Sequence, residues 1–209
     1  IAYYTGDGAA PVKTVPVKGP VINTGYISSN GKYVLTAYED NSAKVWNMAD
    51  GGAGSPLMKG HTGLIRAAAF SADGSTLVTG GRDSLVLVWD DYKMTKKIKY
   101  PSRVRSVAIS NNKKKILVGC EDGIVYENEL GSNDRGILTS YTGARVQNVM
   151  YSGIVSVGMA NNNIRQYSVK TPVIQKKLAG HIRRNMSADE WNTYVGKDVP
   201  YRKINTSLP

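Results

Sequence analysis

A segment that recurs at a fixed spacing constrains this chain more than any other feature. Residues 77–91, LVTGGRDSLVLVWDD, align with residues 34–48, VLTAYEDNSAKVWNM, at an offset of 43. The aligned identities include Thr36, Asp40 and Trp46 in one copy and Thr79, Asp83 and Trp89 in the other. Two further copies place Asp122 and Asn161 at successive offsets of 39. Such self-similarity indicates a repeat protein in which each copy forms one structural unit.

Each copy is predicted to form a small antiparallel sheet. Apolar segments precede the copies, namely VINTGYIS, LIRAAAFS, VRSVAIS and VQNVMYS. Polar turns at residues 29–32 and 72–75 contain Asn-Gly and Asp-Gly, which are strong hairpin signals between apolar runs. A period near 40 residues with three or four short strands per unit predicts an all-β fold of the β-propeller type.

The unit with the strongest pattern also predicts a buried polar cluster. Asp83 lies in a turn, where its carboxylate can accept hydrogen bonds from backbone N–H groups. His61 lies 22 residues before it, and a histidine bridging this carboxylate to the Thr79 hydroxyl, beside the Trp89 N–H, would satisfy polar groups that are costly to bury alone. We call these four residues the blade staple. Counterparts in other units are Thr36, Asp40, Trp46 and Asp122.

These residues resemble the WD-repeat family of β-propellers. Gly60-His61 opens a unit, Asp83 lies in its inner turn and Trp89-Asp90 closes it. The resemblance spans roughly residues 1–181 and implies a WD40-type propeller that serves as a non-enzymatic protein-interaction scaffold or sensor.

The other units depart from this pattern. Lys18 and Tyr100 stand where histidine is expected, and Asn128 replaces a tryptophan. We therefore expect these units to depend on strand packing alone.

The repeats predict about four and a half blades in residues 1–181. The expected units are 1–19 (partial), 20–61, 62–101, 102–143 and 144–181. Because each blade is stabilised by its neighbours, we expect the remaining blades upstream of Ile1 or from another chain.

Residues 182–209 predict a tail with one short helix. Ser187 and Glu190 have capping-box spacing and Gly196 supplies a stop, which predicts a helix over 188–195. This ending resembles tails that follow WD-repeat propellers in large bacterial proteins with STAND-type NTPase or caspase-like peptidase domains. The resemblance implies a bacterial signalling or defence protein, which we expect to be cytoplasmic.

The sequence contains no motif that indicates a catalytic, metal or cofactor site. His61, Asp83 and a hydroxyl resemble part of a hydrolase triad, but no Gly-x-Ser-x-Gly elbow is present. Cys120 is the only cysteine, and residues 50–55, DGGAGS, lack the Lys-Ser/Thr ending of a phosphate loop. No apolar run approaches the ~20 residues of a membrane helix. We expect no enzyme activity, cofactor, metal or membrane contact.

The resemblance also implies a binding surface lined by residues at the start of each unit's first strand and by the residue just before the turn aspartate. These positions include Val21, Asn23, Glu39, Leu64 and Glu121. The others are Arg66, Arg82, Arg103, Arg105, Arg145 and Gln147, which we call the arginine row. Planar guanidinium groups suit bidentate recognition of carboxylate or phosphate, and the chain carries a net charge of +11. We expect a protein or peptide with acidic groups as partner. The alternative is an anion-binding surface for nucleic acid or nucleotide, less favoured because no aromatics interleave the basic residues.

Overall fold

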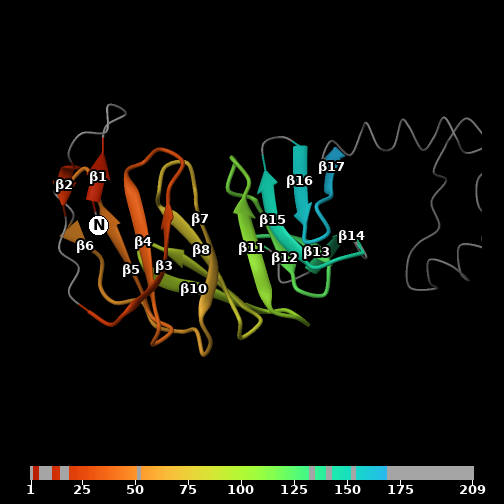
Figure 1. Ribbon diagram of the computed structural model, residues 1–209, viewed down its shortest axis with the longest axis horizontal. Helices are drawn as coiled ribbons and strands as arrows, with labels where there is room; N and C mark the ends of the chain where they lie inside the picture. Colours follow the sequence, from red (N-terminus) through yellow and green to blue (C-terminus); the bar gives the residue numbers. More distant parts are fainter. Residues whose placement is uncertain are drawn as a thin grey trace, which may run out of the picture. The chain divides into compact units, whose positions relative to one another are not determined.

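Every regular element that the structure describes is a β-strand. The computed structural model describes residues 2–4, 11–14, 19–50, 53–131, 135–139, 143–151 and 154–168. The chain divides into two units, Ile1–Gln166 and Tyr167–Pro209, and all strands begin in the first of them (Figure 1). The predicted tail and its helix over 188–195 lie outside the described residues. Within the described part, no helix is long and apolar enough to cross a membrane.

The strands form five antiparallel sheets. A two-stranded sheet pairs β1 (Ala2–Tyr4) with β2 (Pro11–Thr14). Blade 1 contains β3 (Ile22–Ile27), β4 (Tyr33–Tyr38), β5 (Ala43–Asn47) and β6 (Ala53–Gly54). Blade 2 contains β7 (Ile65–Phe70), β8 (Thr76–Gly81), β9 (Leu85–Asp90) and β10 (Lys93–Lys99).

Two more blades follow. Blade 3 contains β11 (Val104–Ile109), β12 (Lys115–Cys120), β13 (Val125–Glu129) and β14 (Arg135–Thr139). Blade 4 contains β15 (Val146–Tyr151), β16 (Ile154–Met159) and β17 (Ile164–Ser168). Three of the blades thus have four strands, in the sequential order of a propeller blade.

A repeated side-chain contact shapes the hairpin between the first two strands of blades 1 to 3. The serine that ends the first strand donates to an Asn or Asp two residues later, at 2.7 Å, and accepts the N–H five residues on. The pairs are Ser28–Asn30, Ser71–Asp73 and Ser110–Asn112. Such local bonds favour a turn over continued strand, so the polar segments fold into hairpins.

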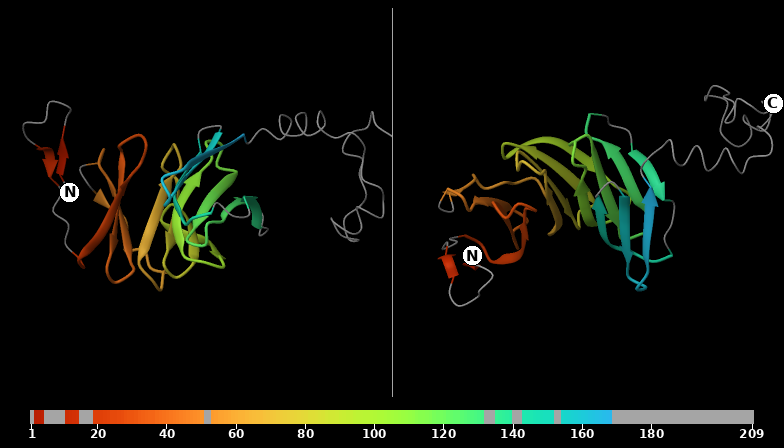
Figure 2. Two further views of the ribbon diagram at one scale, coloured as in Figure 1. Left: turned by 45° about the vertical axis from the view of Figure 1, so that its right-hand side comes forward. Right: turned by 90° about the horizontal axis from the view of Figure 1, so that it is seen from above.

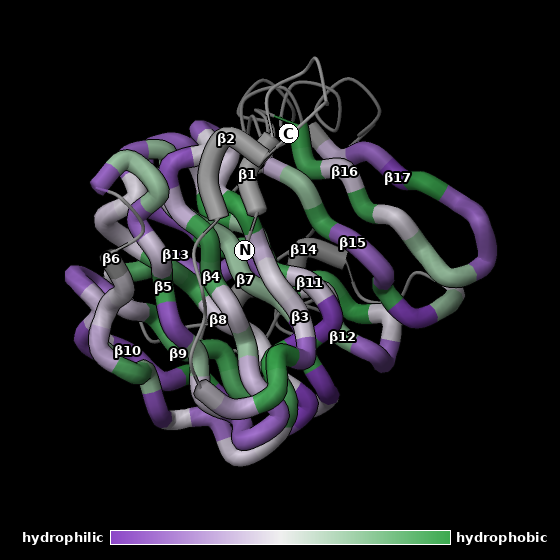
Figure 3. The backbone as a smooth tube through the Cα atoms, turned by 60° about the vertical axis from the view of Figure 1, so that its left-hand side comes forward, coloured by the Kyte–Doolittle hydropathy of each residue, from purple (hydrophilic) through white to green (hydrophobic). Residues whose placement is uncertain are grey.

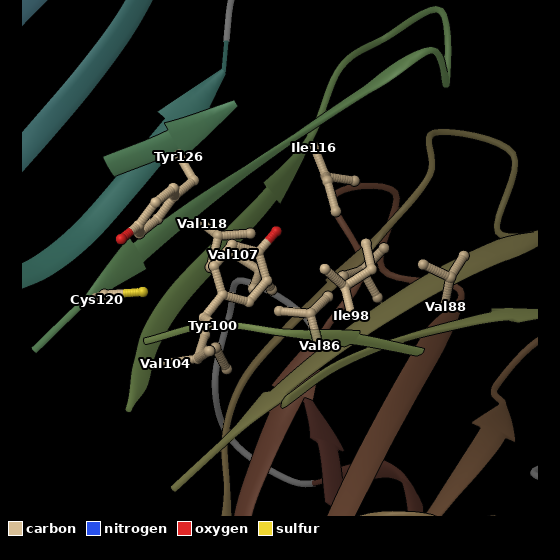
Figure 4. Packing of buried hydrophobic residues seen from close by; sticks show 12 residues of the cluster. Val86, Val88, Ile98, Tyr100, Val104, Val107, Ile116, Val118, Cys120 and Tyr126 are labelled. Carbon is tan, nitrogen blue, oxygen red and sulfur yellow. The ribbon is translucent and has the colours of Figure 1, made fainter. Parts of the chain in front are cut away.

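Neighbouring blades pack face to face. The first strands β3, β7, β11 and β15 lie beside one another in sequence order (Figure 2), and apolar residues of facing blades interlock. Figure 4 shows the cluster between blades 2 and 3, which contains Val86 and Val88 of blade 2 and Val104 and Ile116 of blade 3. A second cluster joins blade 1 to blade 2. Figure 3 shows that hydrophobic stretches recur along the strands that form these faces.

The first strand of every blade contains an irregularity at the same place. Its pairing with the second strand skips one residue, which is Asn23, Arg66, Arg105 or Gln147 in blades 1 to 4. A skipped residue is a β-bulge, which bends the strand and redirects a side chain. Three of the four belong to the predicted arginine row, so the bulge fixes where those side chains emerge.

Candidate functional site

The structure brings the four staple residues of blade 2 into one hydrogen-bonded chain. The Trp89 indole N–H donates to Thr79 Oγ1 at 2.9 Å, and Thr79 Oγ1 lies 2.9 Å from His61 Nε2. His61 Nδ1 lies 2.9 Å from Asp83 Oδ2. The His61 and Asp83 side chains are only 1% and 4% exposed. Asp83 also accepts the N–H groups of Thr62 and Leu85, at 2.8 and 3.1 Å, so the cluster fixes both the turn and the entry of the blade.

The protonation states follow from this geometry. Burial lowers the pKa of His61 and outweighs the opposing attraction of Asp83, so the ring is neutral at pH 7. A neutral ring can donate from Nδ1 to Asp83 and accept at Nε2 from Thr79. Desolvation acts to raise the pKa of Asp83, but the Thr62 N–H and His61 together hold it below its ordinary value. Each side-chain polar group of the blade staple can therefore donate or accept the hydrogen bond that its neighbour requires.

Blade 1 builds a different cluster around the same indole. The Trp46 N–H donates to Thr36 Oγ1 at 2.9 Å, as in blade 2. The third member is Tyr38, whose hydroxyl lies 3.0 Å from Thr36 Oγ1 and whose side chain is almost completely buried. Asp40 accepts only locally, from the N–H and hydroxyl of Ser42. The hydroxyl of a tyrosine thus takes the place of the histidine ring.

In blade 3, both the histidine and the tryptophan of the cluster are replaced. Tyr100 stands at the histidine position and its hydroxyl donates to Asn128 Oδ1 at 2.6 Å, which stands at the tryptophan position. Both residues are buried. Asp122 accepts the Ile124 N–H at 3.1 Å. The expectation that blades 1 and 3 depend on strand packing alone is therefore wrong, because each buries its own polar bridge.

The replacement of histidine in blade 1 can be recognised in the sequence. Gly81 of blade 2 and Tyr38 of blade 1 occupy the same register position, opposite Ile65 and Ile22. A Cβ added at Gly81 would lie 2.8 Å from His61 Nδ1. In blade 2 a glycine accompanies the histidine, whereas in blade 1, which has Lys18 at the histidine position, a tyrosine replaces that glycine. Blade 3 differs, because it has Cys120 at the glycine position. Reading the two positions together would have predicted the exchange in blade 1.

The buried polar groups are poorly placed for catalysis. Thr79 is fully buried and its hydroxyl is already bonded to His61 and Trp89. Burial raises the pKa of the Cys120 thiol to about 12, with a further contribution from Asp122, which disfavours the reactive thiolate. Among the described residues, no cluster of three or more His, Cys, Asp or Glu could hold a metal ion. The staple has the geometry of a structural cluster.

The arginine row gathers at one end of blades 2 to 4. Arg66, Arg105 and Gln147 are the bulge residues of adjacent first strands. The others flank the strand ends, where the backbone of Leu64 bonds to Arg82, Arg103 to Glu121 and Arg145 to Ala160. The row thus follows the end at which first strands begin and second strands finish.

Members of the row differ in their contacts. Arg105 Nη2 donates to Gln147 Oε1 at 3.1 Å, which links blades 3 and 4. Arg103 lies 3.8 Å from the Glu121 carboxylate, with its side chain 61% exposed. Arg66 is half-buried, and its Nε has no hydrogen-bond partner within the described residues. Arg82 and Arg145 are exposed and make no ion pair in the described part of the chain. The sequence did not predict the partners of Arg103 and Arg105.

Comparisons with known proteins agree with this architecture. The family described as "WD domain, G-beta repeat" matches residues 11–47 and 54–90. Small ribosomal subunit protein RACK1y of Oryza sativa subsp. japonica is 34% identical over 93 residues, covering 44% of this chain and 27% of that protein. Transducin beta-like protein 3 of Rattus norvegicus is 22% identical over 191 residues, covering 79% and 24%.

A third relative and a solved structure extend the comparison. U3 small nucleolar RNA-associated protein 15 homolog of Mus musculus is 30% identical over 101 residues, covering 47% of this chain and 17% of that protein. The β-propeller domain of Myceliophteria_thermophila Cps50 (Swd1) superposes with a TM-score of 0.65 at 13% identity, covering 74% of this chain and 54% of that one. The chain spans between 17% and 27% of the length of these three curated relatives.

The fold and the repeats define the class. The described strands form a segment of a β-propeller, and the predicted all-β class is confirmed. Residues 11–47 and 54–90 are similar to the WD-repeat family. The relatives named above are eukaryotic, so they lend no support to the predicted bacterial origin.

Proposed function

We propose that this chain is a non-enzymatic protein-interaction scaffold whose binding surface is the arginine row. The observation that carries the proposal is the Arg105–Gln147 hydrogen bond between neighbouring blades. This bond holds one edge of a planar guanidinium group and leaves its other N–H donors for a ligand. Exposed Arg82 and Arg145 follow on the same row. Guanidinium groups fixed in this way favour carboxylates met in a defined orientation, so the partner is a protein segment rich in Asp or Glu.

The alternative is a nucleic-acid surface. The net charge of +11 supports it, as do the printed names of relatives that are ribosomal or associated with small nucleolar RNA. The narrower hypothesis of a cytoplasmic bacterial signalling or defence protein with further effector domains stays a prediction.

A charge-conserving substitution distinguishes an acidic protein partner from a nucleic-acid ligand. The full chain and its Arg105→Lys variant are titrated with a glutamate-rich peptide and with a single-stranded RNA oligonucleotide, each at two salt concentrations. The matched control is Arg165→Lys, which exchanges an exposed arginine of β17 outside the row. We expect Arg105→Lys alone to weaken peptide binding several-fold, because lysine lacks the planar fork. RNA binding with a steep salt dependence and no effect of Arg105→Lys would favour the alternative.

A further inference from the structure

Blades 2 and 3, and blades 3 and 4, join through a valine that fits against a glycine, whereas blade 1 has Ala37 at the position of that glycine. Gly80 of β8 and Gly119 of β12 face the first strand of the next blade, and a Cβ at either would overlap Val104 or Val146. Both valines are completely buried. We call the valine the knob and the glycine the socket. Because interiors pack at crystal-like density, the missing side chain of the socket defines the shape that the knob fills.

The repeat register places further residues at these positions, because Ile65 of blade 2 and Ile22 of blade 1 are knobs and Gly158 of blade 4 is a socket. Ile22 occupies the knob position of blade 1, since it pairs with Tyr38 as Val104 pairs with Cys120. Gly158 occupies the socket position of blade 4, since it pairs with Asn148 as Gly119 pairs with Ser106.

Within the described residues, the Gly158 socket is empty and the Ile22 knob is not enclosed. The described atoms nearest to a Cβ at Gly158 are 3.9 Å away and belong to Asn148 of the same blade. Ile22 is 45% exposed, whereas the equivalent Ile65 of blade 2 is 1% exposed. The apolar face around the socket is also open, because Ile164 is 75% exposed while its blade 3 equivalent, Val125, is fully buried.

A second apolar contact joins blades 1 and 2. Tyr33 of blade 1 stacks on Phe70 of blade 2, with ring centroids 6.0 Å apart. The positions equivalent to these are Ile154 on blade 4 and Ile27 on blade 1, and they are 46% and 72% exposed. The open face of blade 4 and the first strand of blade 1 therefore carry two complementary apolar pairs.

We propose that a second copy of this chain docks on the open face of blade 4, with its Ile22 in the Gly158 socket and its Ile27 against Ile154. Each copy supplies both surfaces, so two identical contacts can close a pair, as a two-fold assembly requires. Two sets of four blades make eight, within the range in which propellers close. This assembly is independent of the arginine row.

The test is the mass of the full chain in solution, by light scattering coupled to size exclusion. We expect about twice the chain mass of 22.6 kDa for the wild type and for the control Met94→Lys, whose methionine is 47% exposed on β10 of blade 2. Ile22→Lys places a charge against the socket and Gly158→Val fills it, so both variants are expected to run as single chains. A Cβ at Gly158 meets no described atom closer than 3.9 Å, and circular dichroism verifies that both variants are folded.

Three outcomes would overturn the proposal. The first is a wild type that stays a single chain at every concentration tested. The second is a pair that survives both substitutions in folded protein. The third is a continuous series of larger species, which would mean that the contacts do not close on two copies.

Discussion

Tyr38 and Thr36 form a buried hydrogen bond of 3.0 Å that completes the polar cluster of blade 1. The Tyr38 side chain fills space that, in blade 2, belongs to His61, because Gly81 occupies the equivalent position there. One fold position can therefore hold either a glycine beside a histidine or a tyrosine that substitutes for it. The Trp–Thr hydrogen bond is kept in both blades.

Removing the Tyr38 hydroxyl is expected to destabilise the fold modestly. Tyr38→Phe keeps the ring and deletes one buried hydrogen-bond partner, which typically costs about 0.5–1.5 kcal/mol. Denaturant titration measures the change in free energy of unfolding. The control is Tyr33→Phe, because Tyr33 stacks on Phe70 and its hydroxyl makes no hydrogen bond in the described part of the chain. Equal losses in the two variants would contradict a specific role for the Tyr38 hydroxyl.

The blade architecture could be predicted from sequence because it depends on local patterns. The Thr, Asp and Trp spacing and the Asn-Gly and Asp-Gly turns report strand length and hairpin position directly. The exchanges at Tyr38 and at Tyr100–Asn128 could not be read by searching for matching residue types. They depend on which side chains meet across a sheet, and different residues can fill one space in different blades.

The candidate binding surface could also be predicted only in part. Its residues follow from the family resemblance, which assigns a surface to the start of each first strand and to the residue before the turn aspartate. Their partners depend on the distance between blades, and so Gln147 and Glu121 were not predicted as neighbours of Arg105 and Arg103.

Two aspartates at equivalent turns are expected to differ in their contribution to stability. Asp83→Ala leaves His61 and the Thr62 and Leu85 N–H groups without their acceptor, which should cost about 2–4 kcal/mol. Asp122→Ala removes the acceptor of the Ile124 N–H and should cost about 1 kcal/mol. Urea titrations of both variants provide the comparison. Similar losses would show that the His61 contact adds no stability.

The sockets predict a contrast between two glycines. Gly119→Ala forces a methyl group against Val146 and should destabilise the fold by about 1–3 kcal/mol through overpacking. Gly158→Ala meets only Asn148, at 3.9 Å, so the stability of the isolated chain should change little. Thermal unfolding at low protein concentration measures both. A destabilised Gly158→Ala variant with a tolerant Gly119→Ala would reverse the assignment of filled and open sockets.

Stability is expected to fall as the pH drops below neutral. The pKa of His61 in the folded chain lies below its ordinary value of 6.5 because the ring is buried. The neutral ring therefore contributes its full stability above about pH 6.5, and this contribution decreases as the pH falls toward the lower pKa of the folded chain. For one proton, the free energy of unfolding falls by at most about 1.4 kcal/mol per pH unit. Unfolding free energies measured between pH 7 and 5 should show this slope in the wild type. His61→Gln should lack it, and an unchanged slope would assign it to other groups.

Cys120 is expected to resist thiol reagents until the protein unfolds. Its side chain is fully buried in the cluster between blades 2 and 3, and burial raises the pKa of its thiol to about 12. Both effects suppress the reacting thiolate at pH 8. A colorimetric disulfide reagent should therefore modify the native chain no faster than the chain unfolds, and the denatured chain at once. Rapid labelling of native protein would show that these two blades separate readily in solution, and would contradict the tight packing of Val104 against Gly80 on which the knob and socket arrangement rests.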